Sequence, residues 1–168
     1  MARPPGERLL RVIEDPDLGR LELWVWSPPR SGWAFGKRPS DFYEWRGVTG
    51  QLPFIVSIDQ GVEPEAQLVF LDRMARATIV SLSDREPELR RETAAREIAL
   101  ARDWTESATL TEKAFSDSLC LSEINVLTDK EDTNIEVYFD DTANIFAGHV
   151  VTTTLDKAGN IIATGIAG

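Results

Sequence analysis

Cysteine and histidine are almost absent from this sequence, and each occurs once, as Cys120 and His149. A single cysteine can form no disulfide within the chain and no cysteine-based zinc site, so a reducing cytoplasm is the expected location. Cys120 lies in a segment that alternates like a strand, and we expect its thiol to be a small buried side chain. Any mechanism that needs an imidazole must use His149.

Long apolar runs are lacking as well. No stretch approaches the roughly 20 apolar residues that cross a bilayer. Leu9 and Leu10 are followed by charged residues and not by the apolar core of a signal peptide. We therefore expect neither a membrane span nor secretion.

Motifs for nucleotides and metals are also missing. The segment from Gly32 to Lys37 is one residue shorter than a phosphate-binding loop, and Arg38 follows it where a hydroxyl residue is needed. The oxygen-rich segment 129–134 has Asn134 where an EF-hand requires glycine, and strands instead of helices are expected around it. The sequence therefore predicts no cofactor and no metal site.

Basic side chains are scarce in the last third of the chain. The whole sequence has 18 Lys and Arg against 28 Asp and Glu, and residues 106–168 hold three basic side chains against eleven acidic ones. A negative surface repels phosphate backbones and anionic lipids, so we expect no nucleic acid and no membrane as partners. It would attract a basic protein. Solubility alone is the other explanation of such a charge.

The residues that are present suffice for one packed domain. The chain has 168 residues, of which 42% are hydrophobic and 27% charged, and this is the composition of an ordinary globular protein. We expect residues 1–17 to be an N-terminal extension and residues 18–168 to be a single α+β domain.

The first third has the period of two that is typical of strands. Strands are predicted over residues 21–26, 33–36, 42–46 and 54–58, with a turn over residues 27–32. They would form an N-terminal antiparallel β-sheet. Trp24 and Trp26 share the face opposite Leu21, Leu23 and Val25, so this strand is either sandwiched in the molecule or meets a partner through its tryptophans.

The middle third has the period of helices. An apolar stripe predicts one helix over residues 63–82, and Ser83 with Glu86 fits a capping box that begins a second helix through Trp104. The two would form a central helical hairpin. A short third helix is predicted to begin near Thr109 or Thr111.

The last third returns to strand chemistry. Strands are predicted over residues 119–127, 135–140, 145–152 and 161–166, with a tight turn from Asp141 to Asn144 and a hairpin loop that contains Gly159. They would form a C-terminal four-stranded antiparallel meander. Together the sheet, the helices and the meander predict an α+β fold around one core.

This final meander resembles a known family. The segments Tyr138-Phe-Asp-Asp141 and Ile145-Phe-Ala-Gly-His149, and the apolar strand that ends at Gly168, are similar to the closing pattern of the bacterial domain of unknown function 2262. The resemblance covers roughly residues 18–168. Ala147 departs from the pattern, which has an aromatic residue there. The resemblance implies a cytoplasmic bacterial protein and supplies no activity.

Two functions of different class remain open. The first is a non-enzymatic acidic binding protein, for example an immunity-like inhibitor of a basic bacterial protein. Exposed carboxylates and tryptophans are the groups that would contact such a partner. The candidate residues are Asp129, Glu131, Asp132, Asp140, Asp141, Trp24 and Trp26.

The alternative is a small hydrolase-like enzyme in which His149 acts with a carboxylate, either Glu136 or Asp140. A structural His149, bonded to a carboxylate or a carbonyl group, competes with that role. One histidine and no recognisable nucleophile leave few parts for catalysis, so the sequence favours binding.

Overall fold

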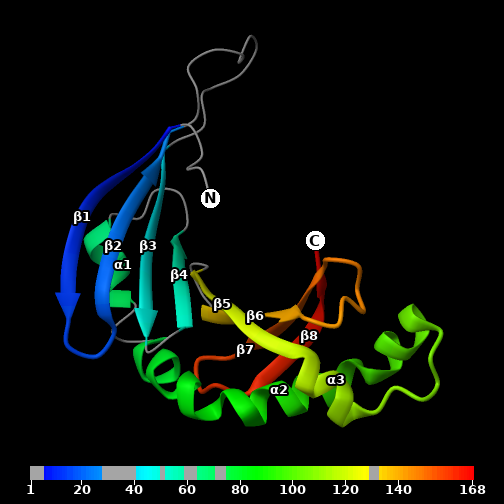
Figure 1. Ribbon diagram of the computed structural model, residues 1–168. Coiled ribbons are helices and arrows are strands. Elements are labelled where there is room, and N and C mark those ends of the chain that lie inside the picture. Colours follow the sequence, from blue (N-terminus) through cyan, green and yellow to red (C-terminus); the bar gives the residue numbers. More distant parts are fainter. Residues whose placement is uncertain (1–5, 28–40, 50–51, 59–63, 71–74, 129–132) are drawn as a thin grey trace.

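The computed structural model describes residues 6–27, 41–49, 52–58, 64–70, 75–128 and 133–168. These residues form one sheet of eight strands with helices packed against one of its faces (Figure 1). The strands are β1 (Glu7–Asp15), β2 (Gly19–Trp26), β3 (Phe42–Thr49), β4 (Leu52–Ile58), β5 (Leu119–Thr128), β6 (Thr133–Asp141), β7 (Val150–Leu155) and β8 (Ile161–Ala167). The helices are α1 (Pro64–Phe70), α2 (Arg76–Thr105) and α3 (Glu112–Ser118).

The strands cross the sheet in chain order from β1 to β8. Neighbouring strands are antiparallel except β4 and β5, which run parallel. A parallel pair needs a crossover connection, and α1, α2 and α3 lie within it. The predicted α+β class, the N-terminal antiparallel strands and the C-terminal four-stranded meander are thus confirmed. The two groups of strands are halves of a single larger sheet, which the sequence did not predict.

One hydrophobic core extends under both halves of the sheet. Alternate strand residues such as Trp45, Val56, Ile124 and Val137 are fully buried, and Leu82 of α2 belongs to the same cluster. Burial of one such side chain stabilises the fold by about 1.5 to 3 kcal/mol. The parallel contact of β4 with β5 therefore lies over this shared core.

The predicted helical hairpin is wrong. In place of two helices that meet at Ser83, α1 has seven residues and α2 has thirty, and α2 continues through Ser83 and Glu86. The apolar stripe on α2 does not stop at the capping signal, because Leu82 before it and Leu89 after it are both buried. Packing of that stripe on the sheet outweighs the local cap preference. The short third helix is confirmed, with Thr111 as its N-cap.

The N-terminal extension contributes a strand. Residues 7–15 form β1, which pairs antiparallel with β2 and makes one edge of the sheet. Leu9, Leu10 and Val12 on this strand are each about 40% exposed. Such exposure agrees with the absence of a clear buried face in its sequence. The strand predicted over residues 33–36 lies outside the described residues.

The strand predicted over residues 145–152 begins only at Val150, so its first half is wrong. Turns occupy residues 142–148, because the Asp141 carboxylate accepts hydrogen bonds from the backbone N–H groups of Ala143 and Phe146, each at 3.1 Å. Asn144, Ala147 and Gly148 have positive φ angles, which an extended strand does not contain. The predicted hairpin loop before β8 is confirmed, with Gly159 at φ +82.

Candidate functional site

The helices leave one face of the sheet uncovered among the described residues. In Figure 1, α1 lies behind the upright strands of the N-terminal half, and α2 runs beneath the strands of the C-terminal half. The face opposite to them is called the open face below. Its side chains are the alternate strand positions that do not enter the core. The sheet bends strongly between its two halves, so the open face is concave.

Carboxylates outnumber cations on the open face. Strand alternation and the pairing registers assign the described charged positions to it. Seven are acidic and two are basic, and this excess of like charge raises the free energy of the free protein. The acidic residues are Glu7, Glu14, Glu22, Glu44, Glu123, Glu136 and Asp140, and the basic ones are Arg20 and Arg46.

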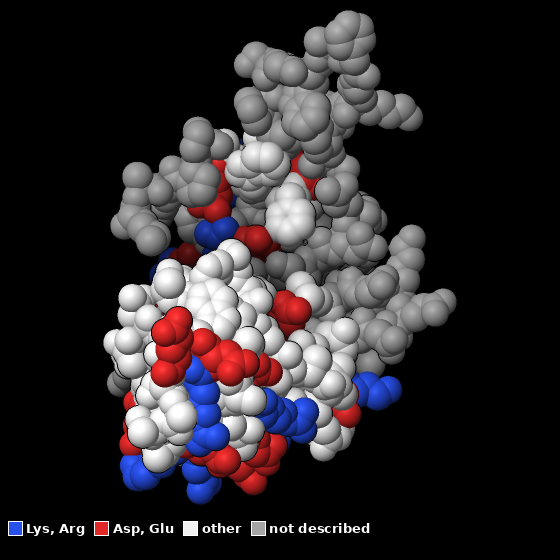
Figure 2. All heavy atoms as spheres, turned by 90° about the vertical axis from the view of Figure 1, so that its right-hand side faces the viewer, with Lys and Arg blue, Asp and Glu red and all other residues white. Residues whose placement is uncertain are grey.

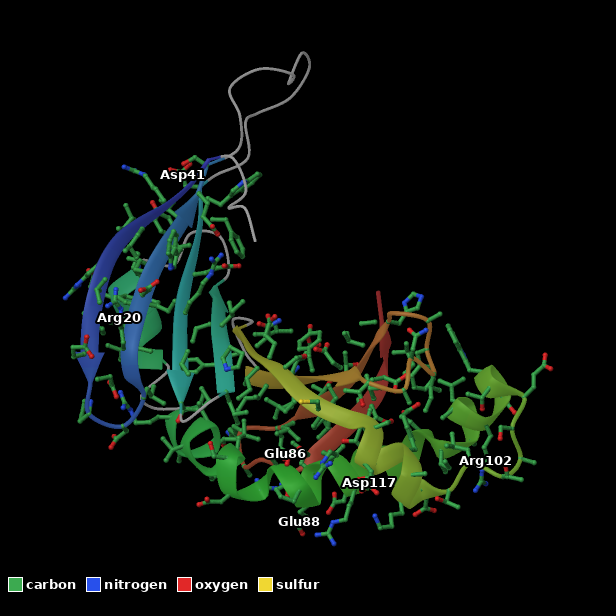
Figure 3. All side chains as sticks on the ribbon, viewed as in Figure 1. Arg20, Asp41, Glu86, Glu88, Arg102 and Asp117 are labelled. Atoms are coloured by element: carbon green, nitrogen blue, oxygen red, sulfur yellow. The ribbon has the colours of Figure 1, made fainter. Side chains whose placement is uncertain are left out.

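Figure 2 looks at the molecule from the right-hand side of Figure 1. Acidic and basic side chains lie in the hollow between its upper and lower parts, beside uncharged rings. The helix layer carries charges of its own. Glu86 and Glu88 of α2 and Asp117 of α3 lie on the lower side of the molecule, away from this hollow (Figure 3).

A pocket of about 210 Å³ lies on the open face of β1, β2 and β3. Its walls combine aromatic rings with charged groups. Trp24 is 6% exposed and Trp26 is 37% exposed, so one indole is packed and the other is accessible. The volume is below the roughly 300 to 1,000 Å³ of small-molecule sites and fits a single side chain better. The residues that line the pocket are Glu7, Trp24, Trp26, Phe42, Glu44 and Arg46.

Arg46 is held in this pocket by two carboxylates and one indole ring. Its guanidinium donates to Glu7 and, at 2.7 Å, to Glu44, and it lies over the Trp24 ring at 5.4 Å from the centroid. Burial opposes the charge of Arg46, but the two carboxylates outweigh it and raise the pKa of Arg46 above its ordinary value. The Trp24 N–H donates to Glu22 at 3.0 Å. The open face therefore already binds one guanidinium.

A second polar group lies on the open face of β5 and β6. The Tyr138 hydroxyl donates to the Glu136 carboxylate at 2.7 Å. The Asn125 side chain is within hydrogen-bonding reach of both Glu123 and Tyr138. Burial raises the pKa of Glu123, and the negative charge of Glu44 adds to this effect. Burial and the bond to Glu136 also raise the pKa of Tyr138.

The structure does not join His149 to a carboxylate. Its ring packs edge to face on Trp104 with 5.8 Å between centroids, and Phe146 contacts the same tryptophan. Glu136 lies opposite Thr154, five residues from His149 and so about 16 Å along the strand. Among the described residues, the imidazole has no hydrogen bond or ion pair. His149 is half-buried within an aromatic cluster at the C-terminal end of α2.

The predicted acidic residues have different environments. Asp140 is exposed on the open face opposite Cys120, whereas the Asp141 carboxylate is used by the turn that follows it. Cys120 is exposed, so its predicted burial is wrong. It lies beyond the irregularity between Leu121 and Glu123 that shifts the register of β5. Asp129, Glu131 and Asp132 lie outside the described residues, and their part in binding stays a prediction.

The sequence did not single out Glu7, Glu44, Arg46, Glu123 or Tyr138 as site residues. One signal was available, because charged or polar residues alternate with apolar ones on β3, β5 and β6. That alternation gives the face on which each residue lies. It does not reveal that the strands are neighbours, since β4 and β5 are separated by the whole helical crossover.

Comparison with known proteins gives a family. Residues 41–166, three quarters of the chain, match the family described as "Uncharacterized protein conserved in bacteria (DUF2262)". The chain belongs to this family. The match of the DUF2262 family includes β3 to β8 with all three helices, and so contains most of the open face. Neither the curated proteins nor the solved structures searched gave a match.

Two further features are absent from the described part of the DUF2262 chain. No helix of the described residues is long and apolar enough to cross a membrane. Within the same residues, no group of three or more His, Cys, Asp or Glu side chains is arranged to hold a metal ion.

Proposed function

We propose that this chain is a non-enzymatic binding protein whose open face covers a basic protein, in the manner of an immunity-like inhibitor. The observation that carries the proposal is that, among the described residues, seven carboxylates and two guanidinium groups lie on a face that none of the described helices covers. A complementary cationic surface would be attracted to this face and would relieve its self-repulsion.

The aromatic pocket supplies the second requirement of a protein interface. Binding energy concentrates in a few aromatic or arginine side chains surrounded by polar groups. Trp26 is accessible at the mouth of the pocket, beside the carboxylates of Glu7 and Glu44. This combination fits a partner that inserts one side chain here while its other cations face the surrounding carboxylates.

The hydrolase hypothesis receives no support from a particular contact, because His149 is packed on Trp104 and not on Glu136 or Asp140. It stays a prediction, as does a cytoplasmic location. Binding of a basic protein gives a role to more of the charged residues on the open face than the hydrolase hypothesis does.

The proposal is tested with the purified products of the genes adjacent to this one, titrated into the chain by isothermal titration calorimetry. We expect a basic product to bind with a Kd of about 1 µM or lower at about 50 mM NaCl. The affinity should fall about tenfold or more at about 300 mM NaCl, because exposed charges are screened. If no adjacent product binds, or if binding is insensitive to salt, the proposal fails.

Two exposed tryptophans provide a matched pair of variants. Trp26→Ala removes the accessible ring of the open face and should weaken binding about tenfold or more. Trp104→Ala removes a ring of similar exposure, 46% against 37%, at the end of α2. It should leave the affinity unchanged as long as circular dichroism shows that the variant is folded. The opposite ranking would place the interface at the end of α2.

A further inference from the structure

Hydrogen-bond acceptors outnumber donors in the polar group on β5 and β6. This group, called the acceptor notch below, consists of Glu123, Asn125, Glu136 and Tyr138. The Asn125 NH2 group and the Tyr138 hydroxyl are its side-chain donors; the hydroxyl donates to Glu136, and the NH2 group lies within reach of Glu123 and Tyr138. The two carboxylates offer about eight acceptor positions, and most of them have no donor from these side chains.

One acceptor of the notch is buried without any partner. The Asn125 Oδ1 atom has less than 1 Å² of accessible surface and no hydrogen-bond donor among the described residues. A buried acceptor without a donor is costly and is rare in folded proteins. Glu123 and Glu136 belong to the same group, so the notch has more acceptors than donors and contains no cationic side chain of its own.

We propose that the acceptor notch binds the guanidinium group of an arginine side chain from the basic partner. This inference rests on the proposed function and names the chemical group recognised at a second point on the open face. A guanidinium has five N–H donors in one plane, so it can serve several acceptors at once. Because the Asn125 Oδ1 atom is buried in the free protein, the side chain must rotate for the guanidinium to reach it, and this rotation would give the orphaned Oδ1 a donor.

The protein itself shows how the open face holds such a group. Arg46 lies between Glu7 and Glu44 against the ring of Trp24. The acceptor notch repeats this chemistry with two carboxylates and the ring of Tyr138, but without an arginine of its own. At Glu123 the negative charge of Glu44 outweighs the positive charge of Arg46, so Arg46 does not cancel the attraction of the notch for a cation.

A lysine ammonium fits the notch less well. It is a compact and strongly hydrated charge with three donors and no planar surface to stack on Tyr138. We therefore expect arginine to bind the notch more tightly than lysine.

Nuclear magnetic resonance of the ¹⁵N-labelled protein tests the inference with N-acetyl-arginine methylamide as the probe. We expect the backbone amides of residues 123–125 and 136–138 and the Asn125 side-chain amide to shift, with a Kd of about 1 to 10 mM. The citrulline analogue, which has the same shape without the charge, should produce no shift. The lysine analogue should bind at least about threefold more weakly. Equal binding of arginine and citrulline, or of arginine and lysine, would overturn the inference.

Two variants with the same change in charge locate the binding. Glu123→Gln should weaken the arginine-dependent shifts about tenfold, since it removes a charge-assisted acceptor. Glu88→Gln removes an exposed carboxylate from the helix side of the molecule and should change nothing. Shifts that survive Glu123→Gln, or shifts that Glu88→Gln reduces equally, would contradict binding at the notch.

This titration uses the protein alone, so its failure can be told from failure of the proposed function. A basic partner that binds while arginine causes no shift at the notch refutes only the inference. Arginine-specific shifts without any basic partner refute only the proposed function.

Discussion

The ionised carboxylate of Glu123 favours binding of a cation in the proposed site but is unfavourable for folding. Burial and the charge of Glu44 both raise its pKa, so the ionised carboxylate is less favourable in the folded protein than in the unfolded chain. A raised pKa of an acid lowers stability at high pH. The penalty is complete above the folded pKa and disappears below the unfolded value of about 4.3.

Glu123→Gln should therefore raise the melting temperature at pH 7 by a few degrees. The gain over the wild type should shrink as the pH falls to about 4, where Glu123 is largely protonated in both states. Thermal denaturation monitored by circular dichroism from pH 4 to 8 measures both effects. A variant that melts below the wild type at pH 7 would show that Glu123 stabilises the fold instead.

His149→Gln should lower the free energy of unfolding by about 1 kcal/mol, because the edge-to-face contact with Trp104 is lost from a half-buried position. Affinity for a basic partner should not change, since the open face is not altered. Urea denaturation and calorimetry provide the two measurements. A variant that is fully stable but has lost a hydrolytic activity of the wild type would support the hydrolase hypothesis.

Among the elements, most strands, including β8, and the short helix α3 were predictable from the sequence, whereas the extents of α1 and α2 and the start of β7 were not. β2, β3, β4, β5 and β6 have a period of two and a buried side, and all five were found. The break placed at Ser83 was wrong because the stripe on α2 continues through it to Leu89. The predicted tight turn from Asp141 to Asn144 is confirmed, but its continuation through Gly148 was missed. It depends on one carboxylate, that of Asp141, which accepts hydrogen bonds from the backbone of residues two and five positions later.

The turn between β1 and β2 is tied to the start of α2 by an ion pair. The Arg76 guanidinium donates to both carboxylate oxygens of Asp15, at 2.5 and 2.7 Å. The same carboxylate accepts hydrogen bonds from the backbone N–H groups of Asp17 and Leu18. The bond to Arg76 is the main reason that the pKa of Asp15 lies far below its ordinary value. Pairing also offsets the unfavourable position of a cation in the first turn of a helix.

Asp15→Asn should therefore reduce the free energy of unfolding by about 2 kcal/mol at pH 7. A lowered pKa gives a stabilisation that is present above the unfolded value of about 3.9 and is lost as the pH falls further. The difference between variant and wild type should thus narrow in acid. Asp17→Asn is the matched control, because Asp17 is largely exposed and contacts Arg76 only at 3.3 Å. Equal losses in both variants would contradict a special role of the Asp15 pair.

At the scale of the whole molecule, the sequence predicted the sign of the charge but not its location. Along the chain, most of the acidic excess lies in the last third, and the sequence therefore predicted an acidic binding surface there. In the folded protein, Glu7 and Glu44 from the first third lie on the same face as Glu123 and Glu136 from the last. Only the long-range parallel pairing of β4 with β5 brings them together, and such pairing leaves no local signal in the sequence.

In the proposed function the open face, and not the overall charge, binds cations. Two triple variants separate these explanations, because each changes the net charge from -10 to -7 by removing three carboxylates. The open-face variant contains Glu44→Gln, Glu123→Gln and Glu136→Gln. The helix-face variant contains Glu88→Gln, Glu92→Gln and Glu112→Gln, all at exposed positions of α2 and α3.

The deciding measurement is the affinity of both variants for a fluorescent hexa-arginine peptide, obtained from anisotropy at about 20 and 150 mM NaCl. The wild type and the helix-face variant should bind alike, and the open-face variant should bind about tenfold or more weakly with less dependence on salt. Equal weakening in both triple variants would mean that net charge alone attracts the peptide, and this would refute binding by the open face.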